Sequence, residues 1–243
     1  MKKKLTIRYI GTNYHGWQVQ KNAITVQQTL QDALERATGT RPGVTGCSRT
    51  DSGVHANMYC CHFEYDGKLP DDKMTDALNA YLPHDIAALS CEDVPDNFHA
   101  RYSVRTKEYI YQIHNAKTPD PFLRNYALYV KSPLDIGQMR QAASRFIGTH
   151  DFAGFCSAGS SVEDTVRKVI AADVTKSGSL VTFNIEANGF LYNMVRIITG
   201  TLLDASYGKI LPGDIPEIIS SKSRDKAGAT APAHGLFLNR VIY

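Results

Sequence analysis

The sequence predicts an α+β protein made of two halves with a similar order of elements. Segments with strand-like alternation and segments with helical periodicity follow one another along the whole chain. A loop rich in Pro and Asp, residues 118–121, lies near the middle, and 243 residues are enough for two domains of about 100–150 residues. We therefore expect an N-terminal half over residues 1–104 and a C-terminal half over residues 105–243, although no clean residue-level repeat relates them.

The N-terminal half is expected to alternate strands with helices. Its first helix is the clearest, because Val26, Leu30 and Leu34 recur along one face at helical spacing. The neighbouring strands are rich in β-branched and aromatic residues. In order, the expected elements are a strand over 4–10, a helix over 26–37, a strand over 54–65, a helix over 71–82 and a strand over 86–94.

The C-terminal half is expected to open with a strand over 105–114. In this strand Tyr109, Tyr111 and Ile113 share one face, since alternate residues point to the same side. Small, polar and acidic residues over 156–164 predict a surface loop. The remaining elements are a helix over 134–146, a hairpin of strands over 166–174 and 180–187 that turns at 176–178, helices over 190–205 and 215–221, and a closing strand over 236–243.

The composition is that of an ordinary globular protein and excludes several classes. Hydrophobic residues make up 43% of the chain and charged residues 21%, which rules out a disordered or collagen-like protein. The 27 Lys and Arg against 24 Asp and Glu leave a net charge of +3, which is too small by itself to indicate a nucleic-acid binder. No stretch has the length and hydropathy of a membrane-spanning helix or a signal-peptide core, so we expect a cytosolic protein that does not enter a membrane.

The five cysteines give no sign of a disulfide framework or a structural zinc site. Their number is odd and none forms a C-x-x-C pair. Cys60, Cys61 and His62 are adjacent, but neighbouring residues of a strand point to opposite faces, so we expect buried, reduced thiols there. The glycine-rich motifs that bind nucleotide phosphates are also missing from the sequence.

The segment from Cys47 to Ala56 has the densest group of residue types that take part in catalysis or binding. Arg49 lies two residues before Asp51 and Gly53 two residues after it, which describes a tight loop that presents a carboxylate beside a cation. Such a cation lowers the pKa of a carboxyl group by roughly 1–3 units, and an ionised carboxylate can act as nucleophile or base. The alternative is an Asx-turn in which Asp51 only bonds its own backbone. His55 follows the loop and either belongs to the site or packs in the core.

Two further clusters place charged residues among apolar or aromatic ones. Within residues 98–111, cations such as Arg101 and Arg105 alternate with aromatic rings, which suits phosphate pairing and base stacking in RNA. The alternative there is a half-buried edge strand whose cations lie in water. Arg196 lies in the most apolar helix, where it either pairs with a carboxylate, for which Asp51 is a candidate, or reaches solvent.

Taken together, five motifs resemble the TruA family of tRNA pseudouridine synthases. The segment Arg49-Thr50-Asp51-Ser52-Gly53-Val54-His55-Ala56 resembles the active-site signature of that family. The others, in chain order, are similar to its N-terminal loop (Tyr14 to Gln20), its central segment (Phe98 to Arg101 with Tyr109 to Tyr111), its arginine helix (Asn193 to Arg196 with Gly200) and its C-terminal end (Ala231 to Leu238). Five motifs in the right order are far more specific than one, so they favour the catalytic interpretation of Asp51 over the turn.

The resemblance implies both a fold and a reaction. The fold is α+β, with two similar, ferredoxin-like-derived α/β-sandwich halves that share a continuous, mostly antiparallel sheet and a central catalytic cleft. The reaction is the isomerisation of uridine to pseudouridine at positions 38, 39 and 40 of the tRNA anticodon stem-loop, without metal or organic cofactor. The implied partners are tRNA, through its anticodon stem-loop and elbow, and a second copy of the chain in a cytoplasmic homodimer.

By the same resemblance, four residues form the catalytic set. Asp51 is the nucleophile that promotes cleavage of the glycosidic bond, and Arg196 pairs with it. Tyr109 stacks on the flipped base and can serve in proton transfer, while Arg49 replaces the extruded base or orders the loop. Extruding a base costs roughly a few kcal/mol, and the freed uracil needs a closed pocket. The expected substrate-binding residues are Tyr109, His55, Arg101 and Arg105.

The sequence departs from the family at two places and leaves alternatives open. Ile10 stands where the family usually has Asp, and Ser48 where it usually has Gly; neither is the nucleophile, so these departures bear on loop geometry or substrate details more than on the reaction. The alternatives are a non-catalytic RNA-binding protein with the same fold and a synthase that modifies another RNA. The chemical role of Asp51 is open as well, between attack on the sugar, attack on the base and departure of the base through a glycal.

Overall fold

The computed structural model describes residues 1–159 and 162–243, and its contacts divide the chain into two compact units. Unit 1 contains Met1–Arg105 together with Phe237–Tyr243, and unit 2 contains Thr106–Leu236. The sequence placed the last strand in the C-terminal half, whereas the structure assigns Phe237–Tyr243 to unit 1. The physical reason is a parallel pairing of Phe237 with His55, which joins residues far apart in the chain.

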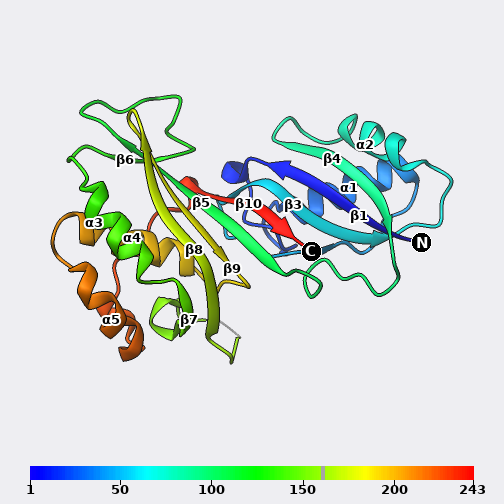
Figure 1. The fold of residues 1–243 in the computed structure, drawn as a ribbon. Helices are drawn as coiled ribbons and strands as arrows, with labels where there is room; N and C mark the ends of the chain where they lie inside the picture. Colours follow the sequence, from blue (N-terminus) through cyan, green and yellow to red (C-terminus); the bar gives the residue numbers. More distant parts are fainter. Residues whose placement is uncertain (160–161) are drawn as a thin grey trace. The chain divides into compact units, whose positions relative to one another are not determined.

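Unit 1 is a sheet with two helices (Figure 1). In chain order it contains β1 (Lys2–Tyr9), α1 (Val26–Thr38), β2 (Thr45–Gly46), β3 (His55–Glu64), α2 (Asp71–Asn79), β4 (Ile86–Val94) and β10 (Leu236–Ile242). Strand β1 pairs antiparallel with β4 on one side and β3 on the other, and β2 and β10 both pair with β3. The β-α-β-β-α-β sequence with the spatial order β4-β1-β3-β2 is that of a ferredoxin-like unit.

The core of unit 1 follows from the periodicities of its sequence. Strand β1 alternates, and its buried positions include Leu5 and Ile7. Helix α1 buries the predicted face, with Val26, Leu30 and Leu34 all fully covered. Helix α2 packs against β4 and also contacts α1, so both helices cover apolar parts of the sheet.

Unit 2 also combines one sheet with helices (Figure 1). Its elements are β5 (Thr106–Asn115), β6 (Leu128–Val130), α3 (Ile136–Ser144), β7 (Gly148–Asp151), β8 (Val166–Ser177), β9 (Leu180–Ala187), α4 (Met194–Ser206) and α5 (Ile215–Ser221). The strands follow the order β5-β9-β8-β7 with antiparallel pairing, and β6 adds a parallel pair to β5. Helix α3 packs against β8 and α4. The run β5, α3, β8, β9, α4 repeats the β-α-β-β-α order of unit 1.

The α+β class and the mostly antiparallel pairing are therefore confirmed, and the differences from prediction are local. Helix α4, the most apolar one, begins at Met194 rather than at residue 190, because Asn193 adopts a left-handed conformation with φ of 61°. The hairpin continues through the pair Ser177–Leu180 and turns at Gly178, whose φ is 58°. The short strands β2, β6 and β7 were not predicted, since two to four residues carry too little periodicity.

The predicted loop over 156–164 contains no helix or strand at the positions that the structure describes, and residues 160–161 lie outside the described part. In the described residues no helix has the length and hydropathy needed to cross a membrane.

Candidate active site

The loop that carries Asp51 joins β2 to β3 in unit 1. It closes as a main-chain turn, in which the carbonyl of Asp51 accepts a hydrogen bond from the amide of Val54 at 3.1 Å. Gly53 has a φ of 79°, which is the left-handed conformation that glycine adopts without strain. The turn leads straight into the buried strand β3, so the position of Asp51 is set by its backbone.

The N-terminal loop between β1 and α1 holds this turn from the side. The carbonyl of Tyr14 accepts hydrogen bonds from the amide of Gly53 at 3.2 Å and from the hydroxyl of Ser52 at 3.3 Å. The approach is close at Gly16, where a Cβ atom would lie 2.4 Å from the carbonyl oxygen of Thr50. The predicted N-terminal motif therefore supports the loop of Asp51 through main-chain contacts.

His55 is a second point of attachment between the two loops. Its side chain is 1% exposed, and its Nδ1 atom accepts a hydrogen bond from the amide of Gly11 at 2.9 Å. Gly11 must be a glycine, because a Cβ atom there would lie 2.0 Å from the carbonyl oxygen of Val54. The imidazole also packs on the ring of Phe237 with centroids 4.6 Å apart. This placement positions the loop, while a direct contact of His55 with substrate stays a prediction.

Three aromatic side chains hold the residues before Asp51. The hydroxyl of Tyr59 donates to the carbonyl of Ser48, and Tyr9 and Thr50 share a hydroxyl–hydroxyl bond of 2.8 Å. Trp17 stacks on Tyr59 with ring centroids 4.2 Å apart. Both neighbours of residue 49 are therefore fixed, and the exposed side chain of that arginine leaves the loop from a rigid base.

Unit 2 contains Tyr109 on strand β5. The predicted alternation is confirmed here, since Tyr109, Tyr111 and Ile113 are buried and lie on one face. Phe190 meets the ring of Tyr109 edge-to-face, with centroids 5.0 Å apart and planes at 83°. Phe190 is only half-buried and precedes α4. The structure thus gives Tyr109 a fixed ring orientation, which is what a stacking residue requires.

Arg196 lies in the first turn of α4 and is held by two acceptors. Its Nη1 atom donates to Oδ1 of Asn193 at 2.7 Å, and its Nε atom donates to the carbonyl of Ala231 at 2.7 Å. The segment around Ala231 lies directly on the helix, because a Cβ atom on Gly200 would be 1.7 Å from the carbonyl oxygen of Ala229. This contact explains why the arginine motif and the C-terminal motif occur together.

A neighbouring hydrogen bond fixes the same segment to β5. The hydroxyl of Tyr111 donates to the carbonyl of Pro232 at 2.7 Å. Burial raises the pKa of Tyr111, while the nearby Arg196 guanidinium opposes that rise. The face of β5 that carries the tyrosines, the start of α4 and the segment before β10 therefore form one packed group in unit 2.

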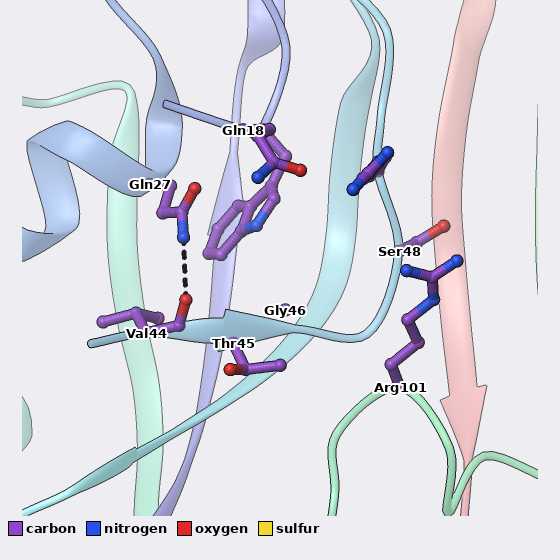
Figure 2. A pocket seen from close by; sticks show the side chains of 9 residues that line it. Gln18, Gln27, Val44, Thr45, Gly46, Ser48 and Arg101 are labelled. Atoms are coloured by element: carbon purple, nitrogen blue, oxygen red, sulfur yellow. Dashed lines mark hydrogen bonds between the residues drawn. The ribbon is translucent and has the colours of Figure 1, made fainter. Parts of the chain in front are cut away.

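The predicted site residues divide between the two units. Arg49, Asp51, His55, Arg101 and Arg105 belong to unit 1, and Tyr109 and Arg196 belong to unit 2. Arg49 and Arg101 line a common hollow (Figure 2). The ion pair of Asp51 with Arg196 joins residues of different units and stays a prediction. Sequence reasoning gave no role to Asn193 or Phe190, although an asparagine before a helix is a known signal for a left-handed residue.

No group of three or more His, Cys, Asp or Glu side chains in the described part of the chain could hold a metal ion. The adjacent thiols of Cys60 and Cys61 are both buried and free of disulfides. Burial raises the pKa of both thiols, which makes them inert structural groups at neutral pH.

Comparison with known proteins decides the family. A family model described as tRNA pseudouridine synthase matches residues 5–103 and 142–243. The chain belongs to the tRNA pseudouridine synthase family. A tRNA pseudouridine synthase A of Thermoanaerobacter sp. (strain X514) is 48% identical over 239 residues, which are 98% of both chains. Those of Ruminiclostridium cellulolyticum and Bacillus licheniformis are 48% and 47% identical, each over 100% of this chain and 99% of the relative.

The family match includes most of the predicted site. Asp51 lies in its first part and Arg196 in its second, whereas Arg105 and Tyr109 fall between the two matched ranges. The curated relatives nevertheless align over nearly the full length of the chain. Among solved structures, a chain titled "Crystal Structure of a Cbf5-Nop10-Gar1 Complex" covers 97% of this chain and 57% of its own length, with 12% identity and a TM-score of 0.40.

Proposed function

We propose that this protein isomerises uridine to pseudouridine in tRNA, at positions 38, 39 and 40 of the anticodon stem-loop. Its family and the names of its full-length relatives support the reaction and the tRNA substrate. The observation that carries the proposal is the loop of Asp51, which main-chain hydrogen bonds anchor to Tyr14 and Trp17. A carboxylate that must attack one atom needs such a fixed position.

In this proposal Asp51 is the nucleophile. Its carboxylate promotes cleavage of the bond between the ribose C1′ and the uracil N1. The freed uracil rotates and forms a new bond from C5 to C1′, after which the proton on C5 is lost and N1 gains one. Product and substrate have the same composition, so the reaction consumes no other reactant. The protein must hold the uracil throughout, which requires a closed pocket.

The other catalytic residues would control the geometry of this step. Tyr109, held by Phe190, would stack on the flipped uracil and serve in proton transfer. Arg196, held by Asn193 and Ala231, would pair with the carboxylate of the nucleophile. Arg49 would occupy the space that the extruded base leaves in the RNA stem, because it is exposed beside the nucleophile.

The same proposal covers the partners. His55, Arg101 and Arg105 are proposed to contribute to tRNA binding, with Arg101 and Arg105 exposed and His55 acting from within the core. We also propose a cytoplasmic homodimer that grips the anticodon stem-loop and the elbow of the tRNA.

Release of tritium from tRNA that carries 5-tritiated uridine tests the reaction directly, since the C5 hydrogen leaves only when the new bond forms. We expect release by the unmodified protein and none by Asp51→Asn, which should still bind tRNA. Absence of release by the unmodified protein would sink the proposal. Mapping of pseudouridine in tRNA from cells that lack the protein tests the positions, and unchanged modification of the anticodon stem would contradict them.

A further inference from the structure

A hollow in unit 1 is lined by hydrogen-bond donors and by no carboxylate. Trp17, Gln18, Ser48, Arg49 and Arg101 contribute to its wall, and its volume is about 190 Å³. Figure 2 shows the guanidinium group of Arg101 turned toward the loop that carries Ser48. We call this feature the Trp17 hollow. A wall of this composition suits a ligand that is anionic and rich in acceptors.

Trp17 supplies a further hydrogen-bond donor to the wall of the hollow. The residue is only 3% exposed, and its indole N–H has no hydrogen-bond acceptor in the part of the chain that the structure describes. Among the described residues only Nδ1 of His114 is a buried side-chain polar atom without a partner, so the indole nitrogen of Trp17 keeps access to solvent, which a ligand can replace. Gly46 packs closely against the indole, because a Cβ atom there would lie 2.7 Å from the indole nitrogen and 2.0 Å from the hydroxyl oxygen of Tyr59.

Two cations on the wall of the Trp17 hollow are also unpaired. Neither Arg49 nor Arg101 has a carboxylate within ion-pair distance among the described residues. The turn of Arg101 is nevertheless fixed, since its amide donates to Nδ1 of His99 at 3.2 Å. Both positive side chains therefore line a hollow in which no carboxylate of the described residues neutralises them.

The donors exclude a stacked base as the occupant. One face of the indole of Trp17 is covered by Tyr59, and the residue is only 3% exposed, so the ring has no free face on which a base could stack. Gln27 is already occupied, because its Nε2 atom donates to the carbonyl of Val44 at 2.7 Å and its Oε1 atom accepts from the amide of Val19 at 2.9 Å (Figure 2). The donors that remain for a ligand include the guanidinium groups of Arg49 and Arg101 and the indole N–H of Trp17, which match phosphate oxygens.

We propose that the Trp17 hollow binds a backbone phosphate of the tRNA, with Arg101 and the indole N–H of Trp17 as its ligands and Arg49 as a further cation of the wall. This inference rests on the proposed function, since it takes tRNA as the substrate. The phosphate contact would anchor the strand next to the loop of Asp51, so that the target nucleotide is presented in a fixed register.

The salt dependence of tRNA binding tests the cation. The dissociation constant of an unmodified tRNA transcript is measured against salt concentration for the unmodified protein and for Arg101→Gln. We expect the slope of log K against log salt to fall by about 1 in the variant. The matched control is Lys73→Gln, which removes a cation that already has Asp76 at 3.7 Å and should leave the slope unchanged. An unchanged slope in Arg101→Gln overturns the proposal.

Trp17→Phe tests the indole edge, because phenylalanine keeps a ring against Tyr59 and removes only the N–H. We expect about tenfold weaker tRNA binding at one salt concentration with an unaltered slope. Ethylation of single tRNA phosphates locates the partner: one ethylated position should weaken binding to the unmodified protein and have no effect in Arg101→Gln. Full affinity of Trp17→Phe, or losses that depend on base identity, would refute a phosphate site. Binding needs no turnover, so tritium release on the same preparation shows separately whether the proposed reaction fails.

Discussion

Replacing His62 with Asn should remove much of the acid sensitivity of unit 1. His62 lies on β3, is 9% exposed, and accepts a hydrogen bond from the amide of Ala100 at Nδ1, 3.1 Å away. Burial lowers the pKa of His62 to about 4, and the neighbouring His99 and Lys2 act in the same direction. Protonation would place a charge in the core and block the acceptor, so the folded protein keeps this imidazole neutral.

The magnitude follows from the two pKa values. An unfolded histidine has a pKa near 6.5, so the shift to about 4 corresponds to about 3 kcal/mol at about 1.4 kcal/mol for each unit. Because the folded pKa is the lower one, this stability is fully present above pH 6.5 and is lost as the pH falls toward 4. At pH 5 the loss should already be about 2 kcal/mol.

Urea unfolding at pH 7.5 and at pH 5 measures this loss. The single tryptophan of the chain, Trp17, lies in unit 1 and reports on its unfolding by fluorescence. Asn can still accept the bond from Ala100 but does not titrate. We expect the unmodified protein to lose about 2 kcal/mol more than His62→Asn between the two pH values.

The control is His84→Asn, which replaces an exposed histidine and should leave the pH dependence as it is. Other groups that titrate in this range, such as His234, whose pKa is lowered by burial, are present in every variant and cancel in the comparison. An equal loss in His62→Asn and the unmodified protein would show that the buried imidazole does not govern acid stability.

Three further substitutions probe the supports of the site. Tyr14→Phe removes a 2.6 Å hydrogen bond to the carboxylate of Asp85, so we expect about 1–2 kcal/mol lower stability in urea and a several-fold lower kcat at similar KM. Gly200→Ala places a methyl group 1.7 Å from a carbonyl oxygen and should cost about 3 kcal/mol or more, whereas Gly213→Ala has open space and should melt like the unmodified protein. Tyr109→Phe keeps the ring but loses the hydroxyl; unreduced tritium release would rule out proton transfer by that group.

Much of the fold was predictable because its signals are local. Helix α1, strand β4 and helix α5 carry complete periodic patterns, and the structure reproduces their bounds to within a residue. The predicted start of α4 was wrong by four residues. The apolar residues from Phe190 onward match the helical pattern but do not show where the helix begins, because the backbone conformation of Asn193 sets that boundary. The pairing of β10 with β3 depends on contacts between distant residues, which no periodicity encodes.

The site was predictable in its residue types and less so in its construction. Asp51 stood out because a cation, a carboxylate and a glycine occur together, and the structure places it on a tight turn. The hydrogen bonds that hold the turn come from the carbonyl of Tyr14 and the imidazole of His55. Every residue has a carbonyl, so a sequence does not reveal which one is used. The glycines at these contacts are the feature of the sequence that indicates this close packing.

The ion pairs of the structure show which cations are already engaged and which are available to RNA. Lys3 is 4% exposed and binds both Asp71 and Asp93, at 2.5 and 2.7 Å, so it contributes to the core of unit 1 rather than to an RNA surface. Lys4 is likewise paired, with Glu92 at 2.5 Å. Arg101 has no such partner in the described residues. A phosphate can bind an unpaired arginine directly, whereas it must displace the carboxylate from a paired lysine. A protein with a net charge of only +3 can therefore depend strongly on a single arginine for tRNA binding.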